Sequence, residues 1–338
     1  MGLTGTGYRR IVSYVRNHAQ LESSLPEGWL MILLWGLPWD SPLARVHSVL
    51  CQRRAAVAFI DQRDVLETEV ELCVDSTVRG VVRTPGRMVS LDQVTAAYVR
   101  PYPSAQLPAI ELAGPFSAAW QHAVNVDDAL MCWADLAPAH VVNRPTAMAT
   151  NSSKPYQALF IQAAGFEVPA TLVTTVPDAV REFWAEHTTV IYKSLSGVRS
   201  IVSRLEEKHQ ARLERVRWCP TQFQQYVSGT DHRVHVVGDE VFACEISSLA
   251  DDYRYAARQG LSVEIRPCQL PQDVVDRCRT VTKSLGLSVT GIDLRRDPEG
   301  RWYCFEVNPS PAFTYYQAAS NQPIDQAIAD LLIRSLPG

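Results

Sequence analysis

The chain has 338 residues, of which 46% are hydrophobic and 20% are charged, and its formal net charge is −4. This length allows two or three compact units, and the composition is that of an ordinary globular protein. The small negative charge argues against a nucleic acid as the main partner. The apolar run 29–35 is too short to span a bilayer, so we expect no membrane partner and a cytoplasmic location.

The N-terminal part divides into a polar lead-in, residues 1–28, and an α/β domain, residues 29–142. Two apolar runs, 30–35 and 56–60, are predicted as buried strands. A helix is predicted between them because Asp-Ser-Pro is typical of a helix start. The order strand, helix, strand favours a parallel sheet, and eight widely spaced cysteines favour reduced thiols.

Arg100 follows an apolar strand of this domain. Parallel sheets place ligand-facing groups at the carboxyl ends of their strands, so Arg100 is a candidate substrate residue. A surface ion pair is the alternative role.

Two lysines mark a central region, residues 143–228. Lys154 precedes a proline that fits the first turn of a helix. Lys193 ends a predicted strand and leads into a loop of small residues, including Ser194, Ser196 and Gly197. A lysine beside free backbone amides suits phosphate binding, although a solvated strand end is the alternative for an isolated lysine.

The last region, residues 229–338, contains the most informative stretch. Two runs rich in β-branched and aromatic residues flank residues 297–300, whose Pro and Gly favour a tight turn. We therefore expect an antiparallel hairpin in which Arg296 pairs with Arg301. In that register Asp293 lies opposite Cys304.

Side chains alternate between the faces of a strand, so Asp293, Glu306 and Asn308 are expected on one face of the hairpin. Three oxygen ligands on one side favour a hard cation such as Mg²⁺. An exposed hairpin with an acidic face is the alternative. The opposite, apolar face is expected to contain Ile292, Leu294, Tyr303, Phe305 and Val307.

The stretch Glu-Val-Asn-Pro-Ser-Pro after a matched Asp resembles the metal-binding hairpin of the ATP-grasp superfamily. The chain is similar to RimK-like and glutathione-synthase-type carboxylate–amine ligases, and to microviridin-type peptide-modifying ligases. The resemblance implies an α/β and α+β fold, with an N-terminal pre-ATP-grasp domain followed by two ATP-grasp subdomains. It also implies that Asp293, Glu306 and Asn308 hold two Mg²⁺ ions against the phosphates of ATP. The family's usual Pro-Gly is here Pro309-Ser310, near the substrate.

The resemblance also assigns roles to residues outside the hairpin. Arg233 and Lys193 are implied to stabilise the transferring phosphoryl group, and Asp231 to bind the ribose. His235 continues the strand face of Arg233 and is expected to be a hydrogen-bonded structural histidine. The implied ATP-binding residues are Lys154, Lys193, Gln224, Gln225, Tyr226, Val227 and Asp231, and the candidate substrate residues are Arg100, Arg254 and Ser310.

The implied function is an ATP-dependent carboxylate–amine or carboxylate–hydroxyl ligase that forms an acyl phosphate and releases ADP and phosphate. The expected substrate is a peptide or an amino acid, and relatives suggest a homodimer or homotetramer. Two alternatives remain: a small-molecule dipeptide or glutathione-like ligase, and a non-catalytic nucleotide-gated binding protein.

Overall fold

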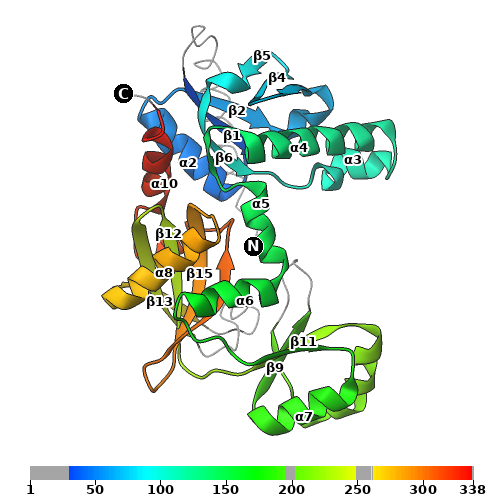
Figure 1. Ribbon diagram of the computed structural model, residues 1–338, viewed down its shortest axis with the longest axis vertical. Coiled ribbons are helices and arrows are strands. Elements are labelled where there is room, and N and C mark those ends of the chain that lie inside the picture. Colours follow the sequence, from blue (N-terminus) through cyan, green and yellow to red (C-terminus); the bar gives the residue numbers. More distant parts are fainter. Residues whose placement is uncertain (1–29, 195–201, 249–259, 261, 337–338) are drawn as a thin grey trace. The chain divides into compact units, whose positions relative to one another are not determined.

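The structure is a computed structural model that describes residues 30–194, 202–248, 260 and 262–336 (Figure 1). The polar lead-in lies outside the described residues. Backbone contacts divide the chain into two compact units. The first contains the described residues up to Pro145 together with those from Asp325 onward, and the second runs from Thr146 to Ile324. The C-terminal helix thus belongs to the first unit, whereas its position in the sequence predicted that it belongs to the last subdomain.

A parallel sheet organises the first unit. Its elements and their connections are β1 (Met31–Gly36), α2 (Ser41–Gln52), β2 (Val57–Asp61), η1 (Gln62–Glu67), η2 (Leu91–Gln93), β6 (Val94–Arg100), η3 (Ser104–Gln106), α3 (Pro108–Ala113), α4 (Ala118–Leu136), β7 (His140–Val142) and α10 (Ile324–Ile333). The strand order is β2-β1-β6-β7, and every neighbouring pair is parallel. The predicted parallel α/β unit is therefore confirmed.

A second sheet of the first unit follows η1. It is antiparallel, has the order β3-β4-β5, and comprises β3 (Glu69–Val74), β4 (Val78–Thr84) and β5 (Arg87–Ser90). Helix α2 begins as predicted, because the Asp40 side chain accepts a hydrogen bond from the amide of Leu43 at 3.1 Å and a proline occupies the first turn.

The second unit contains two antiparallel sheets. The elements after β7 are α5 (Pro145–Met148), η4 (Ala149–Ser152), α6 (Lys154–Ala163), β8 (Thr171–Thr174), α7 (Pro177–His187), β9 (Val190–Ser194), β10 (Ser203–Arg204), η5 (Glu207–Trp218), β11 (Thr221–Gln225), β12 (Thr230–Val237), β13 (Glu240–Ser248), β14 (Val263–Cys268), α8 (Gln272–Ser284), β15 (Val289–Arg296), β16 (Trp302–Asn308) and α9 (Thr314–Ser320). The smaller sheet has the order β10-β9-β11-β8, and the larger has the order β14-β13-β12-β15-β16.

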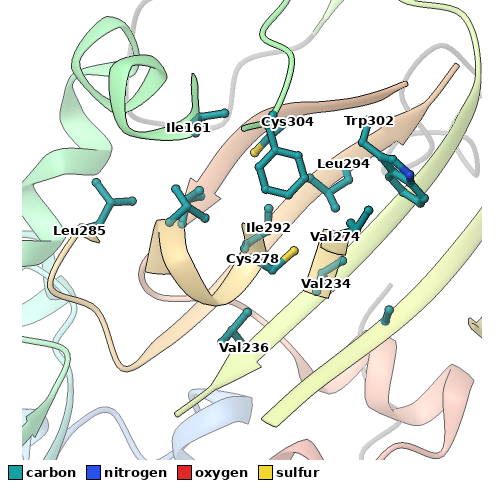
Figure 2. Close-up of a cluster of buried hydrophobic side chains, with 14 of the residues drawn as sticks. Ile161, Val234, Val236, Val274, Cys278, Leu285, Ile292, Leu294, Trp302 and Cys304 are labelled. Atoms are coloured by element: carbon teal, nitrogen blue, oxygen red, sulfur yellow. The ribbon is translucent and has the colours of Figure 1, made fainter. Parts of the chain in front are cut away.

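One face of the larger sheet packs against α8 and α6 (Figure 2). Val234 and Val236 of β12 lie on this face with Ile292 of β15, and Val274 and Cys278 of α8 pack onto them. This burial explains why α8 carries apolar side chains on one side. The other face of the sheet is therefore left for polar side chains and for α9.

The smaller sheet has its own apolar core. Val180 of α7, Leu213 of η5 and Phe223 of β11 pack together with Val190 of β9. The parallel sheet of the first unit and the antiparallel sheets of the second confirm the predicted α/β and α+β class. All eight cysteines are free thiols, and no helix among the described residues is long and apolar enough to cross a membrane.

Candidate active site

β15 and β16 form the predicted hairpin, but its turn is one residue longer than expected. Arg296 lies opposite Trp302 rather than Arg301. Arg301 stays within the turn because the Asp297 carboxylate accepts hydrogen bonds from its backbone amide and its Nε, both at 2.7 Å. Gly300, at φ +87°, adopts the left-handed conformation that closes the turn.

A β-bulge then shifts the register by a second residue. It falls between Asp293 and Leu294, so Asp293 lies opposite Glu306 and the predicted pair with Cys304 is wrong. The pattern of residue types alone carries no sign of this extra residue, because Phe305 simply continues the apolar run 302–305.

The expected polar face is nevertheless present. Asp293 pairs with Glu306, and Gly291 two residues earlier pairs with Asn308, so the three predicted ligands share one face. Between the turn and the bulge the apolar face differs from the expectation: Trp302 and Cys304 are core residues in place of Tyr303 and Phe305, alongside Ile292, Leu294 and Val307.

Each acidic residue of this face has a basic partner. Lys154 Nζ, at the start of α6, lies 2.5 Å from Glu306 Oε1 and 2.8 Å from Asn151 Oδ1. Arg233 Nη1, on β12, lies 2.6 Å from Asp293 Oδ1. The Arg233 side chain is 7% exposed, whereas the Asp293 side chain is 26% exposed. The site thus combines two carboxylates that remain reachable with two cations that neutralise them.

Gly291 makes room for the guanidinium of Arg233. A Cβ atom on Gly291 would stand 2.6 Å from Cζ of Arg233 and 2.7 Å from Cβ of Pro311. The Tyr316 ring of α9 lies on the guanidinium, with 5.3 Å between Cζ and the ring centroid. Arg233 is therefore enclosed by its own sheet and by α9, with one side directed to Asp293.

His235 continues this face of β12 beneath Tyr316, with ring centroids 5.3 Å apart. It is fully buried, and among the described residues neither ring nitrogen has a hydrogen-bond partner. The expectation of a hydrogen-bonded structural histidine is therefore wrong. Burial, and then the charge of Arg233, hold the pKa of His235 well below its usual value, so the ring is neutral.

Arg295 connects three predicted parts of the nucleotide site. Its Nε and Nη2 bind the two oxygens of Asp231 at 2.7 and 2.9 Å, and its Nη1 donates to the carbonyl of Val227 at 2.7 Å. The rings of Tyr226 and Phe305 flank its guanidinium, with centroids 5.8 and 5.3 Å from Cζ. One side chain therefore joins the predicted ATP-binding segment 224–227, the predicted ribose carboxylate and the hairpin.

The predicted ATP-binding segment 224–227 begins in β11 and continues beyond its end. Gln224 is buried and its amide donates to Thr171 Oγ1 at 3.0 Å. The amide of Tyr226 donates to the carbonyl of Thr189 at 2.9 Å, and Gln225 is half-buried. The Gln224 side chain therefore stabilises the smaller sheet, and the linker after it is held by backbone bonds.

Lys193 lies near the end of β9, opposite Gln222 of β11, and is partly exposed. Ser194 is the last residue of that strand and is exposed. The other two predicted phosphate-loop residues, Ser196 and Gly197, lie outside the described residues. The structure thus confirms the strand end but does not describe the loop.

The predicted substrate residues belong to different parts of the chain. Arg100 belongs to the first unit, where its Nε lies 2.6 Å from Asp40 Oδ2 and its guanidinium lies 5.9 Å from the Tyr98 ring centroid. The ion pair, which was the alternative role, is therefore present. Arg254 lies outside the described residues. Ser310 donates its backbone amide to Asn308 Oδ1 at 2.9 Å.

Magnesium fits the donor set of this face. Asp293, Glu306 and Asn308 provide only oxygen ligands, which Mg²⁺ prefers. In the part of the chain that the structure describes, no group of three or more His, Cys, Asp and Glu side chains is placed to hold a metal ion. The predicted ligand set has two carboxylates and one amide, so phosphate oxygens and water would fill the remaining coordination positions of the ion.

Sequence reasoning missed three residues that shape this site. Arg295 stands two positions after Asp293, so the period of a strand already placed both on one face. Gly291 interrupts an apolar strand, which is a sign of a close approach. Gln157 of α6, which binds the backbone of β16, gave no local signal.

The fold and the paired charges of the hairpin face define an ATP-grasp protein. Residues 149–332 match the RimK-like ATP-grasp domain. This match covers more than half of the sequence, and the chain belongs to the RimK-like ATP-grasp family. The resemblance stated from the sequence is therefore confirmed.

Curated relatives of the chain are ligases. It is 30% identical over 114 residues to D-alanine–D-alanine ligase of Chromohalobacter salexigens, covering 30% of this chain and 36% of that protein. It is 25% identical over 202 residues to a probable alpha-L-glutamate ligase of Photobacterium profundum, covering 56% of this chain and 66% of that protein. The matched regions thus span between about a third and two thirds of these relatives.

Solved structures match over greater lengths. The ATP-grasp ligase PsnB, complexed with a phosphomimetic variant of a minimal precursor, Mg and ADP, has a TM-score of 0.78 and 27% identity, covering 90% of this chain and 98% of that one. The macrocyclase MdnC of Microcystis aeruginosa MRC, bound with the precursor peptide MdnA, has a TM-score of 0.77 and 22% identity, covering 90% and 100%. At 22% identity, the likeness to MdnC supports the fold alone.

Proposed function

We propose that this protein is an ATP-dependent ligase that joins a carboxylate of a peptide or amino acid to an amine or hydroxyl group. The observation that carries the proposal is the double pairing on the hairpin face, of Lys154 with Glu306 and of Arg233 with Asp293. Carboxylates that bind a cation and cations that bind phosphate stand side by side. Such a face suits a complex of Mg²⁺ with ATP better than it suits the metal ion alone or the nucleotide alone.

Binding of Mg-ATP would exchange the partners within these pairs. Asp293, Glu306 and Asn308 would hold one or two Mg²⁺ ions, whose charge neutralises the β- and γ-phosphates when bound. Lys154 and Arg233 then turn from their carboxylates to phosphate oxygens. The Lys154 and Glu306 side chains and the Asp293 side chain are each about a quarter exposed, so an incoming metal–nucleotide complex could reach both pairs.

The proposed reaction forms and breaks bonds in two steps. The substrate carboxylate attacks the γ-phosphorus, the bond from this phosphorus to the β–γ bridging oxygen breaks, and ADP leaves. Arg233 and Lys193 stabilise the charge on the equatorial oxygens of the transferring group. The amine or hydroxyl then attacks the acyl carbon, orthophosphate leaves, and the nucleophile loses a proton.

The remaining ATP contacts are part of the proposal. The segment from Gln224 to Val227 would bind adenine, Asp231 would bind the ribose hydroxyls, and Ser194, Ser196 and Gly197 would bind phosphates. The bidentate bond from Arg295 holds Asp231 in place and leaves lone pairs on both carboxylate oxygens for the ribose.

A peptide is the preferred substrate in this proposal. Support comes from PsnB, which is 26% identical to this chain in a structure complexed with the precursor peptide PsnA2 and AMPPNP. Arg100, Arg254 and Ser310 remain the candidates for substrate contacts. A homodimer or homotetramer is the proposed assembly, which light scattering would measure.

The test is product analysis with Mg-ATP and two substrate panels, one of peptides containing acidic residues and one of free amino acids. We expect peptide-dependent release of ADP and orthophosphate, and a hydroxamate when hydroxylamine is added to trap the acyl phosphate. Lys193→Ala serves as the inactive control. Stoichiometric AMP and pyrophosphate would overturn the mechanism.

Two other results would identify the alternatives. Turnover with amino acids and not with peptides would indicate a small-molecule ligase. ATP binding without turnover on either panel would indicate a nucleotide-gated binding protein.

A further inference from the structure

Gln157 of α6 makes two hydrogen bonds to a single residue of β16. Its Nε2 donates to the carbonyl of Val307 at 2.7 Å, and its Oε1 accepts from the amide of Val307 at 2.9 Å. The side chain is 1% exposed. Val307 lies between Glu306 and Asn308, the two proposed metal ligands of this strand.

The position of β16 explains why these bonds matter. β16 is an edge strand, so one row of its backbone groups faces away from the sheet. The bulge opposite Asp293 further weakens the pairing at this point. A one-residue slip would move Glu306 and Asn308 to the apolar face. On this outer edge the backbone of Glu167 binds Trp302 and Cys304, and Gln157 holds the strand further along, at the residue between the two ligands.

The same helix holds β16 at a second point. Lys154 lies three residues before Gln157, on the same side of α6, and its Nζ lies 2.5 Å from Glu306 Oε1. The lysine contacts the carboxylate itself, whereas Gln157 contacts the backbone. The helix therefore fixes both the charge partner and the orientation of the ligands.

We infer that Gln157 is a positioning residue for the magnesium site, acting through the backbone of Val307 on Glu306 and Asn308. The inference rests on the proposed function, since it needs a site that binds Mg²⁺ with ATP. Groups that orient metal ligands typically change metal affinity by about 10- to 100-fold when they are removed.

The first unit offers a matched control. Gln62 is 2% exposed, its Nε2 donates to the carbonyl of Tyr102 at 2.7 Å, and its Oε1 accepts from the amide of Tyr102 at 2.8 Å. The two glutamines thus make the same pair of bonds, and Gln62 has no proposed role in binding ATP. Gln62 Nε2 also donates to Ser104 Oγ at 3.2 Å, so Gln62→Leu removes the same pair of bonds as Gln157→Leu and one more.

The measurement is the melting temperature of the full chain at fixed ATP over a titration with Mg²⁺. Both leucine variants are expected to lower the melting temperature without ligand. Only Gln157→Leu is expected to raise the half-saturating Mg²⁺ concentration, by about tenfold or more. Gln157→Glu keeps the acceptor and loses the donor, so a smaller increase is expected, and this variant carries the test if Gln157→Leu does not fold.

Half-saturation of the Gln157 variants at the wild-type Mg²⁺ concentration would overturn the inference while leaving the proposed function intact. An equal increase in Gln62→Leu would overturn it too, because general loss of stability would then be the cause. A wild-type protein without any Mg²⁺-dependent response to ATP would instead overturn the proposed function itself.

Discussion

The guanidinium of Arg233 occupies the space where a side chain on Gly291 would begin. A Cβ atom on Gly291 would stand 2.6 Å from Cζ of Arg233, well inside contact distance. The two residues lie on neighbouring strands, where Arg233 is opposite Asp293 and Gly291, two residues earlier, is opposite His235. The glycine thus allows an arginine to lie flat against its own sheet.

Gly291→Ala is therefore expected to displace Arg233 from Asp293. Overpacking of this kind typically destabilises a protein by about 1–3 kcal/mol. We expect turnover to fall more than ATP affinity, because the charge of Arg233 matters most during phosphoryl transfer. Steady-state kinetics and ATP titration would measure the two effects.

A double-mutant cycle tests whether the glycine acts through the arginine. In an Arg233→Ala background, Gly291→Ala should have little further effect on turnover. Additive losses in the double variant would contradict this account.

Glu306→Gln should retain the fold and lose the Mg²⁺-dependent response to ATP. The Lys154–Glu306 pair is about a quarter exposed on both sides, so we expect the free energy of unfolding without ligand to change by no more than about 1 kcal/mol. For the wild type, ATP at about 100 times its Kd should add about 2.7 kcal/mol. Thermal melting with and without Mg-ATP measures both quantities.

Glu299→Gln is the control for this substitution, since Glu299 lies in the exposed turn of the same hairpin. It should melt and respond to Mg-ATP as the wild type does. Wild-type turnover in Glu306→Gln would exclude Glu306 as a metal ligand.

Arg295→Lys is expected to weaken nucleotide binding by about tenfold. A lysine cannot bind both oxygens of Asp231 and the carbonyl of Val227 together, because it lacks the planar fork of arginine. Isothermal titration with ATP would measure the loss. Arg296→Lys, a neighbouring exposed arginine, should leave the affinity unchanged, and an equal loss in both variants would contradict the role of Arg295.

We expect His235 to lower the free energy of unfolding at acidic pH. Burial holds the pKa of His235 well below 6.5, so below pH 6.5 the unfolded chain binds a proton that the native state does not. This contribution to stability is complete above pH 6.5 and is lost as the pH falls, by about 1.4 kcal/mol per pH unit.

His235→Leu should reduce the slope of unfolding free energy against pH by about one proton between pH 6 and pH 5. Urea unfolding at a series of pH values measures that slope. An unchanged slope in the variant would show that His235 is already protonated in the native state.

The sequence by itself determined the elements that depend on local patterns. The alternation of side chains along β15 and β16 placed Asp293, Glu306 and Asn308 on one face, and proline and glycine marked the hairpin turn. The parallel sheet of the first unit and the strand that carries Lys193 near its end were equally predictable, because apolar runs and helix starts depend on neighbouring residues.

Only the tertiary structure decided the register of the hairpin. The longer turn shifts the pairing by one residue, which moves Trp302 and Cys304 to the core in place of Tyr303 and Phe305. The bulge adds a second one-residue shift, and two shifts restore the face predicted for Glu306. The prediction of the polar face was thus correct although its register was wrong, because side chains alternate with a period of two.

The tertiary structure also decided the partners of the site residues. Lys154 reaches Glu306 across 152 positions, and Gln157 reaches Val307 across 150. The residues next to Lys154 and Gln157 in the sequence give no sign of these bonds, because the bonds depend on α6 packing beside an edge strand. Long-range contacts of this kind carry no local pattern, so they become visible only when the two segments are brought together in the folded chain.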